Sequence, residues 1–130
     1  MGEALQIVRR QYEAFVRQDW EGLFAFYAPE IEADLSRSGL PDLGTYHGHD
    51  GLREGWGRWR GVWERYDLEL EKLLESGDRV LALTRVQARS KGHGIDTTVR
   101  AADLFTVRDG LIVRFTNYFD RDAARRDAGF

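Results

Sequence analysis

The period of the hydrophobic pattern changes near residue 65, and this change constrains the fold more than any other feature of the chain. Over residues 3–17, apolar side chains such as Leu5 and Tyr12 recur at helical spacing on one face. Over residues 66–71, apolar and acidic residues alternate, which is the pattern of a half-buried strand. Helices followed by a run of strands predict an α+β domain with an antiparallel sheet.

Residues at the expected helix ends support this division. Asp19 is a candidate N-cap for a second helix that Pro29 closes, and Asp50 is a candidate N-cap for a third. Asp120 is expected to cap a short terminal helix that ends near Gly129. We therefore expect three helices before the long strands and one short helix after them.

Alternation and turn signals predict the strands. Ile31–Leu35 is a short candidate strand, and Asp109-Gly110 is a strong hairpin signal. The longer candidate strands begin at Tyr66 and cover residues 79–89, 95–107 and 111–119. Long strands packed against helices curl, and a curled sheet with helices across its mouth encloses a cavity. The expected architecture is one cone-shaped domain over residues 1–130, with three N-terminal helices packed on a strongly curved antiparallel sheet.

Composition excludes several classes of function. The chain has no cysteine, which removes disulfides, thiolate chemistry and cysteine-bound metal. Its net charge is −3 with arginines interspersed among acidic residues, so we expect no nucleic-acid partner. No apolar stretch is long enough for a membrane span and no signal core follows Met1, so we expect a cytoplasmic protein. Serine-nucleophile, phosphate-loop and dinucleotide motifs are absent, and we expect no cofactor.

Aromatic residues are numerous for a chain of this size, with 4 Trp, 5 Tyr and 7 Phe. They indicate either an aromatic core or a pocket lined with rings for a small apolar ligand. The histidines at positions 47, 49 and 93 include a His-x-His pattern, but it lies in a glycine turn without placed carboxylates. We therefore expect no metal site.

The order of motifs resembles the nuclear transport factor 2-like (NTF2-like) superfamily. Within it, the chain is similar to the SnoaL-like polyketide cyclase branch, which is related to ketosteroid isomerase. The matching segments are 19–23 (DWEGL), 27–30 (YAPE), 46–53 (YHGHDGLR), 77–80 (GDRV), 106–112 (TVRDGLI) and 118–121 (YFDR). The resemblance implies the fold predicted above and a ligand cavity. It does not select one function, because this fold supports isomerases, cyclases, epoxide hydrolases, dehydratases and non-catalytic domains.

Asp103 is the sharpest candidate for chemistry because it interrupts the apolar strand segment between Ala101 and Phe105. If it points inward with Phe105, it is a carboxyl group in a dry aromatic cavity, where desolvation raises its pKa. Such an acid can donate a hydrogen bond to a developing oxyanion. The resemblance implies the same role, since ketosteroid isomerases hold an aspartic acid at the matching place. The alternative is an ion pair with Arg85 or Arg100.

The resemblance also implies two partners for Asp103. The isomerases carry a base carboxylate at the end of the first strand, one place away from Asp34, and a tyrosine on the first helix, one place away from Tyr12. On a strand, a displacement of one place reverses the facing side. Asp34 is therefore either the general base or a cap of the turn at Ser36. Tyr12 is either a second donor to the ligand or a core residue whose hydroxyl reaches the rim.

Ring-bearing residues supply the expected cavity wall. Asn117 alternates with Phe115 and Phe119, so we expect an inward amide that contacts either a ligand or internal partners. Trp56 is the member of a helical tryptophan stripe that we place at the cavity. The predicted ligand-binding set is Trp56, Phe105, Phe115, Asn117 and Phe119.

The sequence does not decide which residues of the strand over 79–89 point to the same face as Asp103. A two-residue turn at Gly92-His93 places Ala82 and Thr84 on the face of Asp103, whereas a three-residue turn places Arg85 there. The resemblance favours the second arrangement. The opposite, exposed sheet face is expected to form a homodimer, as in many relatives, and its candidate residues are Val80, Ala82, Val86 and Val113.

Three functions fit these observations. The leading interpretation is a cofactor-free acid–base enzyme of isomerase, cyclase or dehydratase type acting on a small carbonyl or polyketide-like molecule. Asp103, and Tyr12 with it, would hold an enolate oxygen while Asp34 abstracts a proton. The second is a non-catalytic ligand-binding domain that uses the same cavity, and the third is a dimerisation module.

Overall fold

The computed structural model describes residues 2–92, 94 and 96–130. In chain order the elements are α1 (Glu3–Val16), α2 (Trp20–Phe24), β1 (Tyr27–Asp34), β2 (Thr45–His47), α3 (Gly48–Gly61), β3 (Trp63–Ser76), β4 (Arg79–Ser90), β5 (Asp96–Arg108), β6 (Leu111–Tyr118) and α4 (Arg121–Ala128). The α+β class expected from the change of period is therefore present. Helices α1, α2 and α3 precede the long strands, but β1 and β2 lie between α2 and α3, and α4 follows the strands.

The strands form one curved sheet in the order β2-β1-β6-β5-β4-β3. Strands β3, β4, β5 and β6 form the expected antiparallel meander. The expectation of a wholly antiparallel sheet is wrong, because β1 pairs with β6 in parallel. Strand β2 pairs antiparallel with β1 at the outer edge and was not expected from the sequence. The sheet is mixed because β1 runs parallel to β6, the last strand of the meander.

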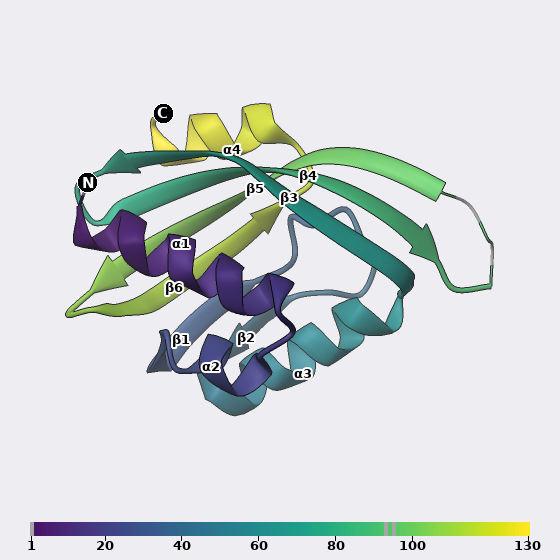
Figure 1. The fold of residues 1–130 in the computed structure, drawn as a ribbon, viewed down its shortest axis with the longest axis horizontal. Helices are drawn as coiled ribbons and strands as arrows, with labels where there is room; N and C mark the ends of the chain where they lie inside the picture. Colours follow the sequence, from purple (N-terminus) through teal and green to yellow (C-terminus); the bar gives the residue numbers. More distant parts are fainter. Residues whose placement is uncertain (1, 93, 95) are drawn as a thin grey trace.

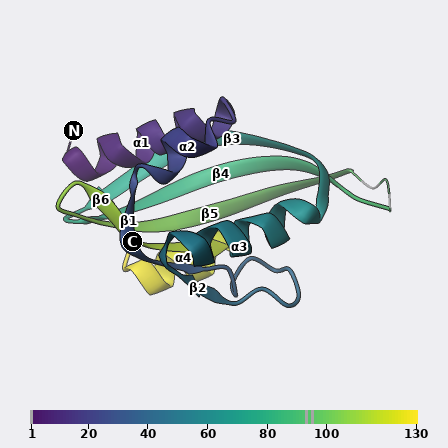
Figure 2. The same cartoon turned by 90° about the horizontal axis from the view of Figure 1, so that it is seen from below.

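Helix α1 lies across the concave inner face of the sheet, while α2 and α3 lie near β1 and β2 at one end (Figure 1). Helix α4 lies on the other face, and Figure 2 shows the sheet between α1 and α4. Two apolar clusters match this layering. The inner one joins Val8 of α1 to Val80 and Phe105 of the sheet, and the outer one joins Leu81 to Ala124 of α4.

The pairing of β4 with β5 shows which residues of β4 point to the inner face of the sheet, a question that the sequence left open. Ala82 lies opposite Asp103, and Thr84 lies opposite Ala101. Ala82 and Thr84 therefore share the inner face with Asp103, as the two-residue turn requires, and the arrangement favoured by resemblance is wrong. Arg85 lies on the outer face, with its Nη1 atom 3.7 Å from Oε2 of Glu69. The hairpin tip itself includes His93, which lies outside the described residues.

This register also corrects the expected dimer face. Val80 and Ala82 belong to the inner cluster under α1, and both are fully buried. Val86 lies opposite Leu68, a residue of the inner face, so it does not belong to the exposed face either. Part of the outer face is covered by α4, whose Arg121 donates to the backbone oxygens of Thr84 at 2.7 Å and Ala101 at 3.1 Å.

Local capping follows the sequence at two helices and departs from it at a third. The side chain of Asp19 accepts from the backbone N–H of Gly22, and that of Asp120 accepts from Asp122. The terminal helix ends at Ala128 and is followed by Gly129, which has the left-handed φ of 75° that favours glycine. Asp50 is not a cap, because α3 begins earlier, after His47.

Helix α2 is shorter than expected. It ends at Phe24, well before Pro29, which lies inside strand β1. Within the described part of the chain, no helix combines the length and the apolar character needed to cross a membrane.

Candidate functional site

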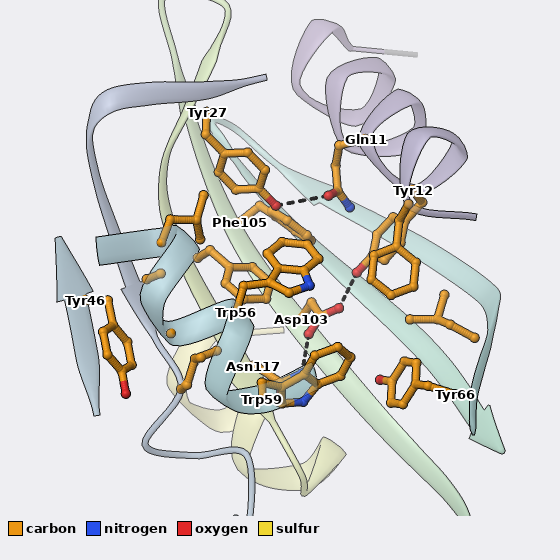
Figure 3. A pocket seen from close by; sticks show the side chains of 17 residues that line it. Gln11, Tyr12, Tyr27, Tyr46, Trp56, Trp59, Tyr66, Asp103, Phe105 and Asn117 are labelled. Atoms are coloured by element: carbon orange, nitrogen blue, oxygen red, sulfur yellow. Dashed lines mark hydrogen bonds between the residues drawn. The ribbon is translucent and has the colours of Figure 1, made fainter. Parts of the chain in front are cut away.

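A cavity of about 60 Å³ lies between α1, α3 and the inner face of the sheet. A single water needs about 10–15 Å³, so the open space holds a few waters or part of a small ligand. The lining is almost wholly apolar and rich in rings (Figure 3). It consists of Gln11, Tyr12, Phe15, Tyr27, Ala33, Leu35, Tyr46, Leu52, Gly55, Trp56, Trp59, Tyr66, Leu68, Asp103, Phe105, Phe115 and Asn117.

Asp103 carries the acidic chemistry of this cavity. It lies in the middle of β5 with its side chain on the inner face, and the residue is only 5% exposed. Its Oδ2 atom accepts a hydrogen bond from the hydroxyl of Tyr12 on α1. Its Oδ1 atom accepts from the amide of Asn117 at 2.6 Å, because Asn117 lies directly opposite on β6. The alternative of an ion pair with an arginine is not what the structure shows.

Burial and the two donors act on this carboxyl group in opposite directions. Desolvation raises its pKa, while the hydrogen bonds from Tyr12 and Asn117 stabilise the anion and lower it. Desolvation is the larger effect, and it raises the pKa of Asp103 from 3.8 to about 6. The same burial, together with the nearby carboxylate, raises the pKa of Tyr12 well above 10. Asp103 therefore exchanges its proton near neutral pH while Tyr12 remains a hydrogen-bond donor.

A second polar pair lies in the cavity wall. The hydroxyl of Tyr27 donates to Oε1 of Gln11 at 3.0 Å, and both residues are buried. Sequence reasoning missed this pair, although a signal was present. Gln11 follows Ile7 by four positions and Val8 by three, so it interrupts the apolar stripe of α1 just as Asp103 interrupts β5.

The residues predicted for the cavity wall line the cavity, with the exception of Phe119. Trp56, Phe105 and Phe115 line the cavity with Asn117. Phe105 packs against Phe115 with ring centroids 5.2 Å apart and against the edge of Tyr12 at 5.7 Å. The placement expected for Phe119 is wrong. Strand β6 ends at Tyr118, so the alternation stops there.

Phe119 lies outside the cavity, is 57% exposed and packs near Gly39 in the turn-rich loop.

Asp34 also lies outside the cavity. Its Oδ1 atom accepts from the backbone N–H of Ser36 at 2.9 Å and from the Ser36 hydroxyl, so it caps the turn. Ala33 lines the cavity in its place. The bulge in β1 falls before Glu32 and does not turn Asp34 inward. The expected general base is therefore not at the site, and among the described residues the lining holds one carboxyl group, Asp103.

The histidines make structural contacts. His49 Nε2 lies 2.8 Å from the backbone oxygen of Tyr27, and His47 Nε2 lies 3.4 Å from a carboxylate oxygen of Glu32. His93 lies outside the described residues. Over the part of the chain that the structure describes, no group of three histidine, aspartate or glutamate side chains is placed to hold a metal ion.

An outer groove adjoins the cavity where α1, α3 and β3 meet, and it measures about 430 Å³. Phe15, Trp59, Tyr66 and Leu68 line both spaces. The aromatic side chains of Phe15, Trp59 and Tyr66 contact one another. The ring centroids of Trp59 and Tyr66 are 4.4 Å apart, and Phe15 lies 6.5 Å from Trp59 and 6.2 Å from Tyr66. We call these three side chains the ring wall.

Solved structures similar to this chain over nearly its whole length include an NTF2-like protein. This protein, from Burkholderia thailandensis E264, is 29% identical, with 98% of each chain covered and a TM-score of 0.83. A polyketide cyclase candidate from Xanthomonas campestris pv. campestris is 27% identical, with 94% of this chain and 93% of that chain covered and a TM-score of 0.71. TerC, co-crystallized with polyporic acid, is 25% identical, with 96% and 97% covered and a TM-score of 0.78.

A family model narrows this class further. The model of the SnoaL-like domain matches residues 8–115, which include the cavity residues from Tyr12 to Phe115. The chain belongs to the SnoaL-like domain family. A search of curated proteins found no match.

Proposed function

We propose that this protein binds a small, largely apolar molecule carrying a carbonyl group and catalyses proton transfer at the carbon next to that carbonyl. The observation that carries the proposal is the environment of Asp103. It is a buried carboxyl group in a ring-lined cavity, held at both oxygens by neutral donors, with a pKa of about 6. A group with this pKa accepts and returns a proton near neutral pH without a cofactor.

In this proposal Asp103 replaces Asp34 as the base. The Asp103 carboxylate removes a proton from the carbon beside the ligand carbonyl, and the C–H electron pair moves into the enolate. Where the substrate has a double bond conjugated with the enolate, the resulting dienolate takes the proton from Asp103 at its γ-carbon, which gives isomerisation. In a substrate with a second carbonyl, the enolate carbon forms a C–C bond to that carbonyl. In the second case the new alkoxide takes the proton from Asp103. Either path returns Asp103 to the carboxylate and conserves the atoms of the substrate.

Two relatives support the class of ligand. TerC was crystallized with polyporic acid, and the Xanthomonas relative is a polyketide cyclase candidate. Both are similar to this chain over nearly its whole length, and the cavity here is lined mainly by rings. An aromatic or polycyclic ligand suits such a wall because ring faces and edges pack favourably against one another.

Proton exchange on a simple ketone tests the proposal without knowledge of the natural substrate. The bicyclic ketone 2-tetralone would be incubated with the protein in deuterated buffer, and loss of its α-proton signals would be followed by NMR. We expect exchange above the buffer rate that increases as pH rises through about 6, when Asp103 becomes a carboxylate. Asp103→Asn should lower the exchange rate that the protein adds to the buffer rate about 100-fold or more. Asp34→Asn, which alters only the turn, is the matched control.

The outcomes separate the enzyme from the binding domain. Polyporic acid and 2-tetralone would also be titrated against both variants by calorimetry. Binding without exchange at any pH would overturn catalysis and leave the ligand-binding domain, which is the second candidate. If neither compound binds, the proposed cavity function is overturned. Exchange that is equal in wild type and Asp103→Asn would remove Asp103 from the chemistry.

We also propose a homodimer through the outer sheet face, at a different place from that expected. The part of this face beyond α4 carries the paired strand positions Arg85 and Arg100, with Glu69 beside Arg85. Opposite charges on one face allow a two-fold copy to pair Glu69 with an arginine of the other chain. Sedimentation equilibrium at low and high salt tests this arrangement, and a monomer at every salt concentration would overturn it.

A further inference from the structure

The indole N–H of Trp56 is buried without a hydrogen-bond partner. Among the described residues, the buried side-chain nitrogens and oxygens that lack a partner are the indole nitrogens of Trp56 and Trp63. Trp56 lines the cavity, whereas Trp63 lines the outer groove. A buried donor without a partner is unfavourable, because its bonds to water are lost and nothing replaces them. Such a group at a cavity wall indicates a ligand acceptor.

Packing fixes the direction of this donor. The Trp56 ring is surrounded by other aromatic rings at centroid distances of 5.7–6.3 Å, namely Phe15, Trp20, Phe24 and Trp59. In Figure 3 the indole nitrogen lies on the side of the ring that faces Tyr12 and Asp103. The three groups line one cavity. The N–H therefore points toward the place where Asp103 would act on a ligand.

Three other donors of the cavity wall are already engaged within the protein. The hydroxyl of Tyr12 donates to Asp103, as does the amide of Asn117, and the hydroxyl of Tyr27 donates to Gln11. A ligand oxygen that took the Tyr12 proton would have to break the Tyr12–Asp103 bond. A ligand oxygen that accepts from Trp56 breaks no hydrogen bond of the protein.

We propose that Trp56 Nε1–H binds the carbonyl oxygen of the ligand, and that the ligand is therefore a ketone or enol whose oxygen lies between Trp56 and Asp103. This inference rests on the cavity function proposed above and adds the atom that recognises the ligand oxygen. It differs from the arrangement implied by the isomerase resemblance, in which the tyrosine and the aspartic acid hold the oxygen. As a proton leaves the neighbouring carbon, negative charge grows on the oxygen, and the hydrogen bond from Trp56 strengthens.

The test compares two probes that differ by one oxygen atom. The ketone 2-tetralone and the hydrocarbon tetralin would be titrated against wild type, Trp56→Phe and Trp63→Phe. Trp56→Phe keeps an aromatic ring and removes the N–H. We expect it to reduce the ketone preference, measured as the ratio of the two dissociation constants, about tenfold, which corresponds to about 1.4 kcal/mol. Trp63 also has a buried indole nitrogen without a partner, but it lines the outer groove and not the cavity, so Trp63→Phe should leave the preference unchanged.

A second measurement does not depend on a variant that folds well. In a ¹⁵N-labelled wild-type sample, the indole N–H signal of Trp56 should lie further downfield with 2-tetralone than with tetralin, because both probes carry the same aromatic ring and only the ketone offers an acceptor. If wild type binds the ketone but Trp56→Phe keeps the full preference and the indole signal lies at the same place with both probes, the Trp56 inference is wrong and the cavity function stands. If wild type binds neither probe, the cavity function fails first, and this inference fails with it.

Discussion

Tyr12 and Asp103 are 91 positions apart in the chain and are joined by one hydrogen bond inside the domain. This bond connects α1 to the centre of β5 across the concave face of the sheet. Asn117 reaches the other carboxylate oxygen from the neighbouring strand. The contacts that organise the cavity therefore also attach the first helix to the sheet, and changes at these residues should alter stability and chemistry together.

The buried carboxyl group should make stability depend on pH. Because the folded pKa of Asp103 is raised from 3.8 to about 6, the folded state binds its proton more tightly than the unfolded state. The resulting stabilisation is fully present below about pH 4 and is lost as pH rises to about 6. The shift corresponds to about 3 kcal/mol, since one pKa unit is about 1.4 kcal/mol. Urea unfolding of wild type and Asp103→Asn from pH 3 to 7.5 measures it, because the contributions of the other carboxylates cancel in the difference.

The expected sign is that Asp103→Asn gains stability relative to wild type as pH rises over this range. A difference between the two proteins that is independent of pH would show that Asp103 titrates at its ordinary pKa.

Tyr12→Phe should raise the pKa of Asp103 further. The variant keeps the ring that packs on Phe105 but loses the O–H that stabilises the carboxylate, so the pKa moves above about 6. Carboxyl ¹³C chemical shifts followed through a pH titration report this value directly. Tyr27→Phe is the control because its hydroxyl bonds to Gln11 and not to Asp103. Equal titration curves for the two variants would contradict the assigned role of Tyr12.

Gly55 should tolerate alanine poorly because α3 approaches β2 closely at this point. A Cβ atom on Gly55 would lie 2.6 Å from Cδ2 of the Tyr46 ring, whereas one on Gly57 would meet nothing within 4 Å. Both glycines lie inside α3, so alanine brings the same gain in helix propensity at each. Thermal unfolding should therefore show Gly55→Ala less stable than Gly57→Ala by about 1–3 kcal/mol.

Both alanine variants should still bind ligand if they fold. Gly55→Ala should bind bulky ligands more weakly, because the added methyl group displaces the ring of Tyr46, which lines the cavity. Equal stability of the two variants would mean that the Tyr46 ring turns away at no cost.

Asp34→Ala should affect stability and leave the site unchanged. The substitution removes the bonds to Ser36 at an expected cost of about 1 kcal/mol. Ketone exchange and ligand affinity should remain at the wild-type level, since Asp34 does not line the cavity. A large loss of exchange rate with normal folding would restore Asp34 as the base and overturn the assignment to Asp103.

The sequence predicted the parts of this protein that depend on local chemistry. Asp19 and Asp120 cap their helices because the side-chain oxygen meets an N–H two or three residues ahead. The inward position of Asp103 was also predictable from its immediate neighbours, because a single polar residue interrupts an apolar strand segment there. The same logic would have found Gln11.

Features that depend on distant pairing were not predictable in this way. Nothing local to β1 indicates that it pairs in parallel with β6, nor that Thr45–His47 forms an edge strand beside it. The facing of β4 depended on the length of one turn, and a difference of one residue there reverses every side chain. Phe119 was misplaced because alternation predicts facing only while the strand continues, and β6 ends one residue earlier.

The ring wall has a consequence for how a ligand would reach Asp103. Phe15, Trp59 and Tyr66 come from α1, α3 and β3, and they border both the inner cavity and the outer groove. Rotation of these side chains, without a hinge in the backbone, would join the two spaces into one channel with the carboxyl group at its closed end. The size of molecule admitted would then be set by the rotamers of three rings. Replacing Trp59 by alanine would convert a chamber for a few waters into a tunnel open to solvent.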